Sequence, residues 1–154
     1  MTKPSVYTEG FIFVGCFMRL ITLSEEFYNK YCNCVEVLQK QTRPYVCLEM
    51  KIRGTTFAIP FRHHIRHKHA FITYGECGLD YTKAVVIADS RYIENTSPRI
   101  EQNEFNAIKG KESKIHKGMN DYIKLYKKAL QYKDSPHYSN IIRYSSLQYF
   151  ERFL

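Results

Sequence analysis

The chain has 154 residues, which is enough to bury one sizeable hydrophobic core and too few for two independent cores. Hydrophobic residues make up 44% and charged residues 25%, with only 7 Gly and 5 Pro, so the composition excludes a disordered chain and a collagen-like repeat. The 23 Lys and Arg against 15 Asp and Glu give a net charge of +8, which is typical of proteins that bind a polyanion. No stretch approaches about 18 uninterrupted apolar residues, which excludes a transmembrane helix.

The N-terminal segment contains an apolar run, residues 11–18, that we interpret as a strand. One Lys and one Glu precede it and no small-residue cleavage site follows, so it does not have the pattern of a signal peptide. Five cysteines, an odd number, then predict reduced thiols and a cytoplasmic location. We expect a single domain over residues 1–154, in which residues 1–17 could be an extension because Met18 is a plausible translation start.

Residues 24–88 predict one short helix followed by strands. Ser24 is a good N-cap for a helix over residues 24–31. Residues 45–52 alternate between apolar and polar side chains, and residues 55–61 predict the return strand of a hairpin, with a turn at Arg53-Gly54. Pro60 marks the position where ladder pairing should stop. Residues 69–74 and 81–88 predict two more strands around a turn at residues 75–78.

The last third of the chain has helical periodicity instead. Residues 113–132 carry apolar side chains at three- and four-residue steps with lysines between them, which predicts an amphipathic helix. The sequence Asp134-Ser135-Pro136 should end it, and residues 139–153 predict a second helix. Strands followed by helices predict an α+β fold in which the helices pack on a mainly antiparallel sheet.

The densest chemical signal is the cationic cluster, residues 62–69, which directly follows the hairpin. It consists of Arg62, His63, His64, Ile65, Arg66, His67, Lys68 and His69. Cleavage of RNA by its own 2′-OH needs a base for the hydroxyl proton, cations for the phosphorane and an acid for the leaving 5′-oxygen. Histidine can serve in either proton role and arginine binds phosphate oxygens in a fork, so the cluster is a candidate site for RNA cleavage.

Other interpretations of these residues remain open. The cluster could be a solvated basic loop, and lysines such as Lys114 and Lys117 could be ordinary surface charges of a helix. A role in RNA binding requires those lysines to lie on the same side as the histidines. A zinc site is disfavoured, because three cations in the cluster would repel the ion and Cys32-x-Cys34 has no second cysteine pair. We therefore expect no metal ion and no cofactor.

Three blocks of the sequence carry a resemblance to a known family. They run from Arg43 through the Gly54 turn to Arg62, from Ile65 to Phe71, and from Gly78 to Ala84. In order and spacing they resemble the ToxN/AbiQ-type endoribonuclease toxins of type III toxin–antitoxin systems, with the TenpN and CptN branches most similar. The similarity runs from about Arg19 to Ile87, and beyond that the chain matches only in its helical character.

The resemblance implies a twisted, barrel-like, mainly antiparallel sheet with flanking helices and a helical C-terminal part. It implies metal-independent RNA cleavage that leaves a 2′,3′-cyclic phosphate, and a possible role in phage defence. It also implies two RNA partners, a substrate and a small repeated RNA antitoxin that the toxin processes and that inhibits it in a protein–RNA assembly.

Carried over onto this sequence, the resemblance assigns roles to the candidate residues. Arg43 stands where such toxins have a lysine near the scissile phosphate, and Arg62-His63 stands where they have a Thr-Ser pair. This difference favours His63 as the base, with His67 as the acid and with Arg62 and Arg43 on the phosphate. The candidate RNA-binding residues are His64, Arg66, Lys68, Tyr81, Lys83, Lys114 and Lys117.

The leading hypothesis is therefore an endoribonuclease toxin. The main alternative is a non-catalytic RNA- or DNA-binding module, since 13 Tyr offer flat faces on which bases can stack. A zinc-dependent nuclease or hydrolase is the third hypothesis, and it would contain stoichiometric metal.

Overall fold

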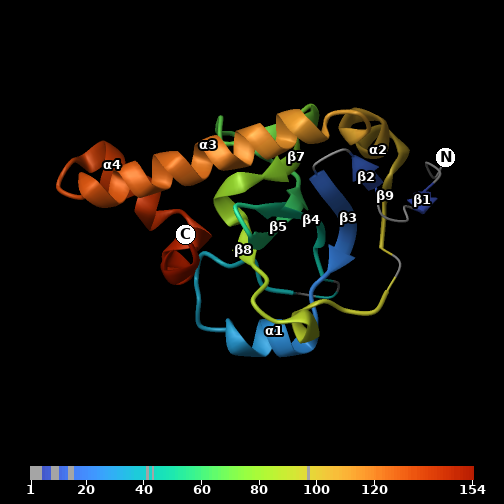
Figure 1. Ribbon diagram of the computed structural model, residues 1–154, viewed down its shortest axis with the longest axis horizontal. Coiled ribbons are helices and arrows are strands. Elements are labelled where there is room, and N and C mark those ends of the chain that lie inside the picture. The colour runs from blue at the N-terminus through green and yellow to red at the C-terminus, as the bar shows by residue number, and fades with distance from the viewer. Residues whose placement is uncertain (1–4, 8–10, 14–15, 41, 43, 97) are drawn as a thin grey trace.

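Antiparallel strands in the first two thirds of the chain and helices in the last third confirm the α+β fold class (Figure 1). The computed structural model describes residues 5–7, 11–13, 16–40, 42, 44–96 and 98–154, with side chains from Met18 onward. Its strands are β1 (Ser5–Tyr7), β2 (Phe11–Phe13), β3 (Cys16–Thr22), β4 (Val46–Ile52), β5 (Thr55–Arg62), β6 (Ala70–Tyr74), β7 (Cys77–Asp80), β8 (Val85–Val86) and β9 (Arg99–Glu101). Its helices are α1 (Glu25–Lys30), α2 (Gln102–Ile108), α3 (Glu112–Gln131) and α4 (Pro136–Arg143), with 3-10 helices η1 (Tyr81–Lys83), η2 (Ser90–Tyr92), η3 (Ser146–Tyr149) and η4 (Glu151–Phe153).

The main sheet has the strand order β2-β3-β4-β5-β7-β6, with β8 also paired to β5, and all its described pairings are antiparallel. The predicted hairpin turn is present: Arg53 has φ 50° and Gly54 has φ 81°, the left-handed values of a two-residue turn whose twist suits a hairpin. The ladder between β4 and β5 ends at Pro60 as expected, with Cys47 opposite Pro60 as its last pair, whereas β5 itself continues to Arg62 by pairing with β7. Pro60 lies where the partner on one edge of β5 changes from β8 to β7.

The chain between β7 and β8 leaves the sheet, so the prediction of one strand over residues 81–88 is wrong. Asp80 is the N-cap of η1, and its Oδ1 accepts a hydrogen bond from the backbone N of Thr82 at 2.9 Å. A capping aspartate favours a helical turn over an extended strand. Because β7 and β8 both pair with β5, η1 interrupts a single antiparallel path and carries Thr82 and Lys83 out of it.

Helix α3 crosses one side of the sheet and α1 lies on the opposite side (Figure 1). The predicted amphipathic helix is confirmed, since its apolar stripe is buried. This stripe and the strand side chains form one hydrophobic core that extends from Met18 to Phe150. Helix α1 begins as predicted after Ser24, whose Oγ accepts a hydrogen bond from the backbone N of Phe27 at 3.4 Å.

The C-terminal part is helical, but it does not form the single helix expected over residues 139–153. Helix α4 begins at Pro136, because proline needs no hydrogen bond to its N atom in the first helical turn. It ends at Arg143, and the chain then turns inward at Ser145, which has 0% exposure. The Ser145 Oγ accepts from the Tyr122 hydroxyl at 2.7 Å, which anchors this turn to α3.

Candidate functional site

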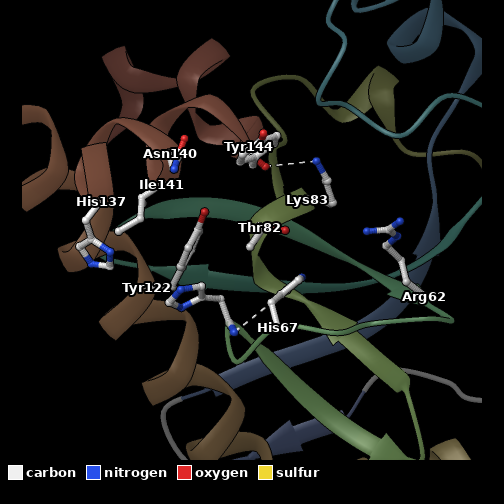
Figure 2. Close-up of a pocket in the computed structure, with 10 residues that line it drawn as sticks. Arg62, His67, Thr82, Lys83, Tyr122, His137, Asn140, Ile141 and Tyr144 are labelled. Carbon is white, nitrogen blue, oxygen red and sulfur yellow. Dashed lines mark hydrogen bonds between the residues drawn. The ribbon is translucent and has the colours of Figure 1, made fainter. Parts of the chain in front are cut away.

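A pocket of about 460 Å³ opens between the end of β5, the loop after it, η1 and α4 (Figure 2). This volume lies within the range of about 300–1,000 Å³ that is usual for ligand sites. The pocket is lined by Arg62, His67, His69, Thr82, Lys83, Tyr122, His137, Asn140, Ile141 and Tyr144. The cationic cluster therefore contributes Arg62, His67 and His69 to one cavity.

Helix α4 and the residue that caps it form one wall of this pocket. His137, Asn140, Ile141 and Tyr144 recur at steps of three and four residues, so they share one face of the helix. Figure 2 shows His137 on the opposite side of the pocket from Arg62. The wall contains neither a carboxylate nor a lysine or arginine, whereas the facing side carries the cations.

The end of this wall at Tyr144 and the nearby Ser146 are attached to η1 and its C-cap residue by hydrogen bonds. Lys83 Nζ donates to the carbonyl oxygen of Tyr144 at 3.1 Å and forms an ion pair with Glu36. Ser146 Oγ, two residues beyond the wall, donates to the carbonyl oxygen of Ala84 and lies 3.1 Å from that of Thr82. These contacts join Glu36, η1 and the segment that follows α4, so they fix the position of α4 relative to the cationic cluster.

The carboxylate of Asp80 organises the cationic side of the pocket. It has 0% side-chain exposure, and Arg62 Nη1 donates to its Oδ2 at 2.7 Å. Its Oδ1 accepts from Thr82 Oγ1 at 2.6 Å and lies 3.3 Å from Nε2 of His67. A guanidinium has five N–H groups and this contact uses one, so Arg62 is fixed in place while its other donors can bind a phosphate.

Both ring nitrogens of His67 already have partners. The backbone N of His69 donates to Nδ1 at 3.2 Å, and Nε2 faces Asp80. With Nδ1 accepting a hydrogen bond, the proton of the neutral ring belongs on Nε2, where it points at the carboxylate. This geometry favours a positioning role for His67 over the predicted role as the acid.

Two other imidazoles in the pocket have free nitrogens. Neither ring of His69 and His137 makes a hydrogen bond to another described residue. Burial lowers the pKa of His69 below its ordinary value of 6.5, electrostatic interaction with Lys68 and with the protonated form of His67 lowers it further, and Asp80 acts in the opposite direction to a smaller extent. Its ring packs against Tyr122, with a centroid distance of 5.5 Å. His69 is therefore neutral at neutral pH and able to accept a proton.

A second hollow, of about 420 Å³, adjoins the first, and His69 and Tyr122 line both. Lys68 lines it from the cationic cluster, and Lys114 and Lys117 line it from α3. The helix lysines thus lie on the same side as part of the cluster, as RNA binding requires. Lys117 pairs with an aspartate one turn along the helix, whereas Lys68 and Lys114 form no ion pair within the described part of the chain.

The other half of the cationic cluster is directed elsewhere. His63 Nδ1 lies 2.9 Å from Sγ of Cys77, and His63 lines neither hollow. His64 has φ 60°, and both His64 and Arg66 face Glu76, at 3.8 and 3.3 Å. The left-handed turn at His64 divides the cluster, so the structure does not bring His63, His64 and Arg66 to the pocket.

Three further predicted residues have other surroundings. Tyr81 borders the second hollow but is only 5% exposed, and its hydroxyl donates to the carbonyl of Ile115 at 3.1 Å. Lys83 lines the pocket, but its ammonium is engaged by Glu36. Arg43 lies outside the described residues.

Sequence reasoning missed Asp80, His69, His137 and Asn140 as site residues. Asp80 had a detectable signal, since an aspartate side chain commonly hydrogen-bonds the backbone two residues later and so caps a turn. His69 was visible within the cluster but had no feature that set it apart from its neighbours. His137 and Asn140 gave no signal, because only the packing of α4 brings them to the cluster.

No cluster of three or more His, Cys, Asp or Glu side chains that could hold a metal ion occurs among the residues that the structure describes. None of the described helices is long and apolar enough to cross a membrane. No protein-family model matches the chain, and no curated protein or solved structure is detectably similar to it.

Proposed function

We propose that the protein is a metal-independent endoribonuclease that cleaves RNA by attack of the ribose 2′-OH on the adjacent phosphate. The observation that carries this proposal is one pocket lined by two imidazoles with free nitrogens, His69 and His137, and by Arg62 held on a buried carboxylate. These groups match the three needs of the reaction: a base, an acid and a cation at the phosphate.

In the proposed mechanism His69 takes the proton of the 2′-OH. The oxygen O2′ attacks phosphorus, so a P–O2′ bond forms while the P–O5′ bond breaks. The products are a 2′,3′-cyclic phosphate and a 5′-hydroxyl end. The lowered pKa of His69 supports this role, since a neutral imidazole is needed before the proton is taken.

His137 gives a proton to the leaving O5′ and regains one from solvent, to which it is exposed. Arg62 stabilises the charge that develops on the phosphorane oxygens, and Asp80 keeps it in position before the substrate arrives. Lys68 and Lys114 bind neighbouring phosphates in the second hollow.

We further propose that this endoribonuclease is the toxin of a type III toxin–antitoxin system, acts in the cytoplasm, and processes and is inhibited by a small repeated RNA. The support is the resemblance of three sequence blocks, each of which supplies a residue to the first pocket: Arg62, His69 and Thr82. The basic second hollow would serve both RNA ligands.

The test is incubation of the purified protein with a long RNA in excess EDTA. We expect cleavage products with 2′,3′-cyclic phosphate ends, and a loss of about 10²-fold or more in kcat for His69→Gln and for His137→Gln. His116→Gln, on α3 and outside both hollows, is the matched control and should cleave like the wild type.

Three outcomes would contradict parts of the proposal. Loss of all cleavage on chelation would exclude the metal-independent mechanism. Full activity of both variants, with loss in His63→Gln instead, would move the site to the cluster half beside Cys77. Salt-dependent binding of RNA that stays intact would identify a non-catalytic binding module.

A further inference from the structure

We propose that the α4 wall binds one nucleobase of the RNA strand, and that Asn140 reads the edge of that base and so sets the nucleotide preference of cleavage. The base-binding part of the wall consists of Asn140, Ile141 and Tyr144, whereas His137 in the same wall keeps its role as the acid. This inference rests on the proposed function and adds to it a specificity site.

The two sides of the pocket differ in charge, as do the two ends of a nucleotide, its anionic phosphate and its uncharged base. Arg62 and the imidazole of His69 line the side formed by the cationic cluster, whereas the α4 wall has no permanent charge. A ribose–phosphate placed against Arg62 therefore leaves its base directed across the cavity towards α4 (Figure 2). The cavity volume of about 460 Å³ has room for one nucleotide.

Ile141 and Tyr144 provide surfaces that fit the flat face of a base. Tyr144 is 55% exposed, and the Arg143 guanidinium lies 5.4 Å from the centroid of its ring. The hydrogen bond from Lys83 to the Tyr144 carbonyl fixes the backbone at this position. Single-stranded RNA is commonly bound by stacking of its bases on such aromatic rings.

Asn140 is placed one turn before Tyr144 on the same helix face, and it is exposed. Its side-chain amide makes no hydrogen bond to any other residue in the described part of the chain, so both its donor and its acceptor are available. An amide can donate and accept along one base edge at the same time, which distinguishes one base from another. Among the α4 residues that line the pocket, Asn140 is the one with a side-chain amide, which carries a hydrogen-bond donor and an acceptor side by side and has no charge.

The experiment uses the full chain and an RNA pool with a randomised segment, in which the cleavage sites are sequenced. Wild-type protein should show a nucleotide preference at one position beside the cleaved bond. We expect Asn140→Ala to reduce that preference by about tenfold. Asn140→Asp should shift the preference towards bases that present an amino group, because a carboxylate only accepts hydrogen bonds.

Tyr144 is tested by KM against kcat on one fixed RNA. Tyr144→Ala should raise KM by about tenfold with a smaller change in kcat, and Tyr144→Phe should restore most of the lost affinity because the ring is kept. The matched controls are Tyr132→Ala, at a tyrosine that is 54% exposed but outside the pocket, and Asn29→Ala on α1.

The outcomes separate this inference from the function on which it rests. If the wild type does not cleave RNA, the proposed function fails. If the wild type cleaves with a preference that both Asn140 variants retain in full, only the base-reading site is refuted. A loss of preference in Asn29→Ala as well would also refute it, since the effect would then not be specific to the α4 wall.

Discussion

At the residue scale, the chemistry of the site depends on one buried carboxylate and one half-buried imidazole. Asp80 holds Arg62 and His67 in place, and these contacts leave His69 as the imidazole of the cluster with a free ring in the pocket. Burial and the surrounding positive groups then lower the pKa of His69. The proton-accepting group is thus selected by its surroundings rather than by its residue type.

The pH dependence of cleavage follows from that shift. We expect kcat/KM to rise with pH as His69 loses its proton, with a midpoint below 6.5. The same group affects stability: the unfolded chain binds more protons than the folded one near this pH, so the free energy of unfolding rises with pH up to the ordinary pKa of histidine. Cleavage rates and urea unfolding measured over a series of pH values test both expectations. If kcat/KM of His69→Gln still falls at low pH as in the wild type, the titration belongs to another group.

Asp80→Asn tests the anchoring of Arg62. Removing the charge leaves the guanidinium without its counter-ion, and we expect a loss of about 2–3 kcal/mol in the free energy of unfolding, because Arg62 is 30% exposed and partly solvated. Asp121→Asn breaks the exposed pair with Lys117 and should cost less than about 0.5 kcal/mol. Equal effects in urea unfolding would contradict a special role for Asp80.

At the element scale, η1 and α3 approach each other closely, and this contact shapes the second hollow. Gly118 of α3 faces Tyr81 of η1, and a Cβ at position 118 would lie 2.4 Å from the tyrosine hydroxyl. The same hydroxyl donates to the carbonyl of Ile115. The absence of a side chain at this one position lets α3 lie against η1.

Gly118→Ala is therefore expected to destabilise the protein by about 1 kcal/mol or more, although alanine favours an isolated helix over glycine by about that amount. The penalty should shrink in a Tyr81→Phe background, where the closest atom is removed. Thermal or urea unfolding of the four proteins of this double-mutant cycle measures the coupling. A stabilised Gly118→Ala protein would show that α3 and η1 do not approach this closely.

At the scale of the whole molecule, the net charge of +8 matters through the cations that the fold gathers beside the pocket. Lys68 comes from the loop after β5 and Lys114 from α3, and neither is neutralised by an ion pair within the described residues. A polyanion can thus contact cations from two distant parts of the chain at once.

RNA affinity should therefore fall steeply with salt. We expect Lys114→Ala to lower the slope of log K against log salt concentration by about 0.7, the value for one phosphate contact on a single strand. Lys51→Ala, an exposed lysine of β4 outside both hollows, should leave the slope unchanged. Fluorescence anisotropy with an RNA that lacks the 2′-OH at the cleaved position measures binding without cleavage.

Patterns of a few residues predicted most of the elements. The Ser24 cap, the Arg53-Gly54 turn and the apolar stripe of α3 are local signals, and the structure confirms each. Local signals failed where a short sequence could satisfy its hydrogen bonds in more than one way. Asp80 capped a turn where a strand was expected, and Pro136 began a helix where a break was expected.

The sequence alone established the α+β class, the excess of positive charge and a short list of candidate imidazole and guanidinium groups. Periodicity is a local property of the chain and net charge is a sum over it, so neither requires the tertiary structure. Only the tertiary structure decided which of these groups meet. The left-handed turn at His64 sends His63 towards Cys77, and the docking of α4 brings His137 and Asn140 to the pocket with His69. Such contacts depend on the packing of segments that are distant in the chain, so the spacing of residues within one segment does not predict them.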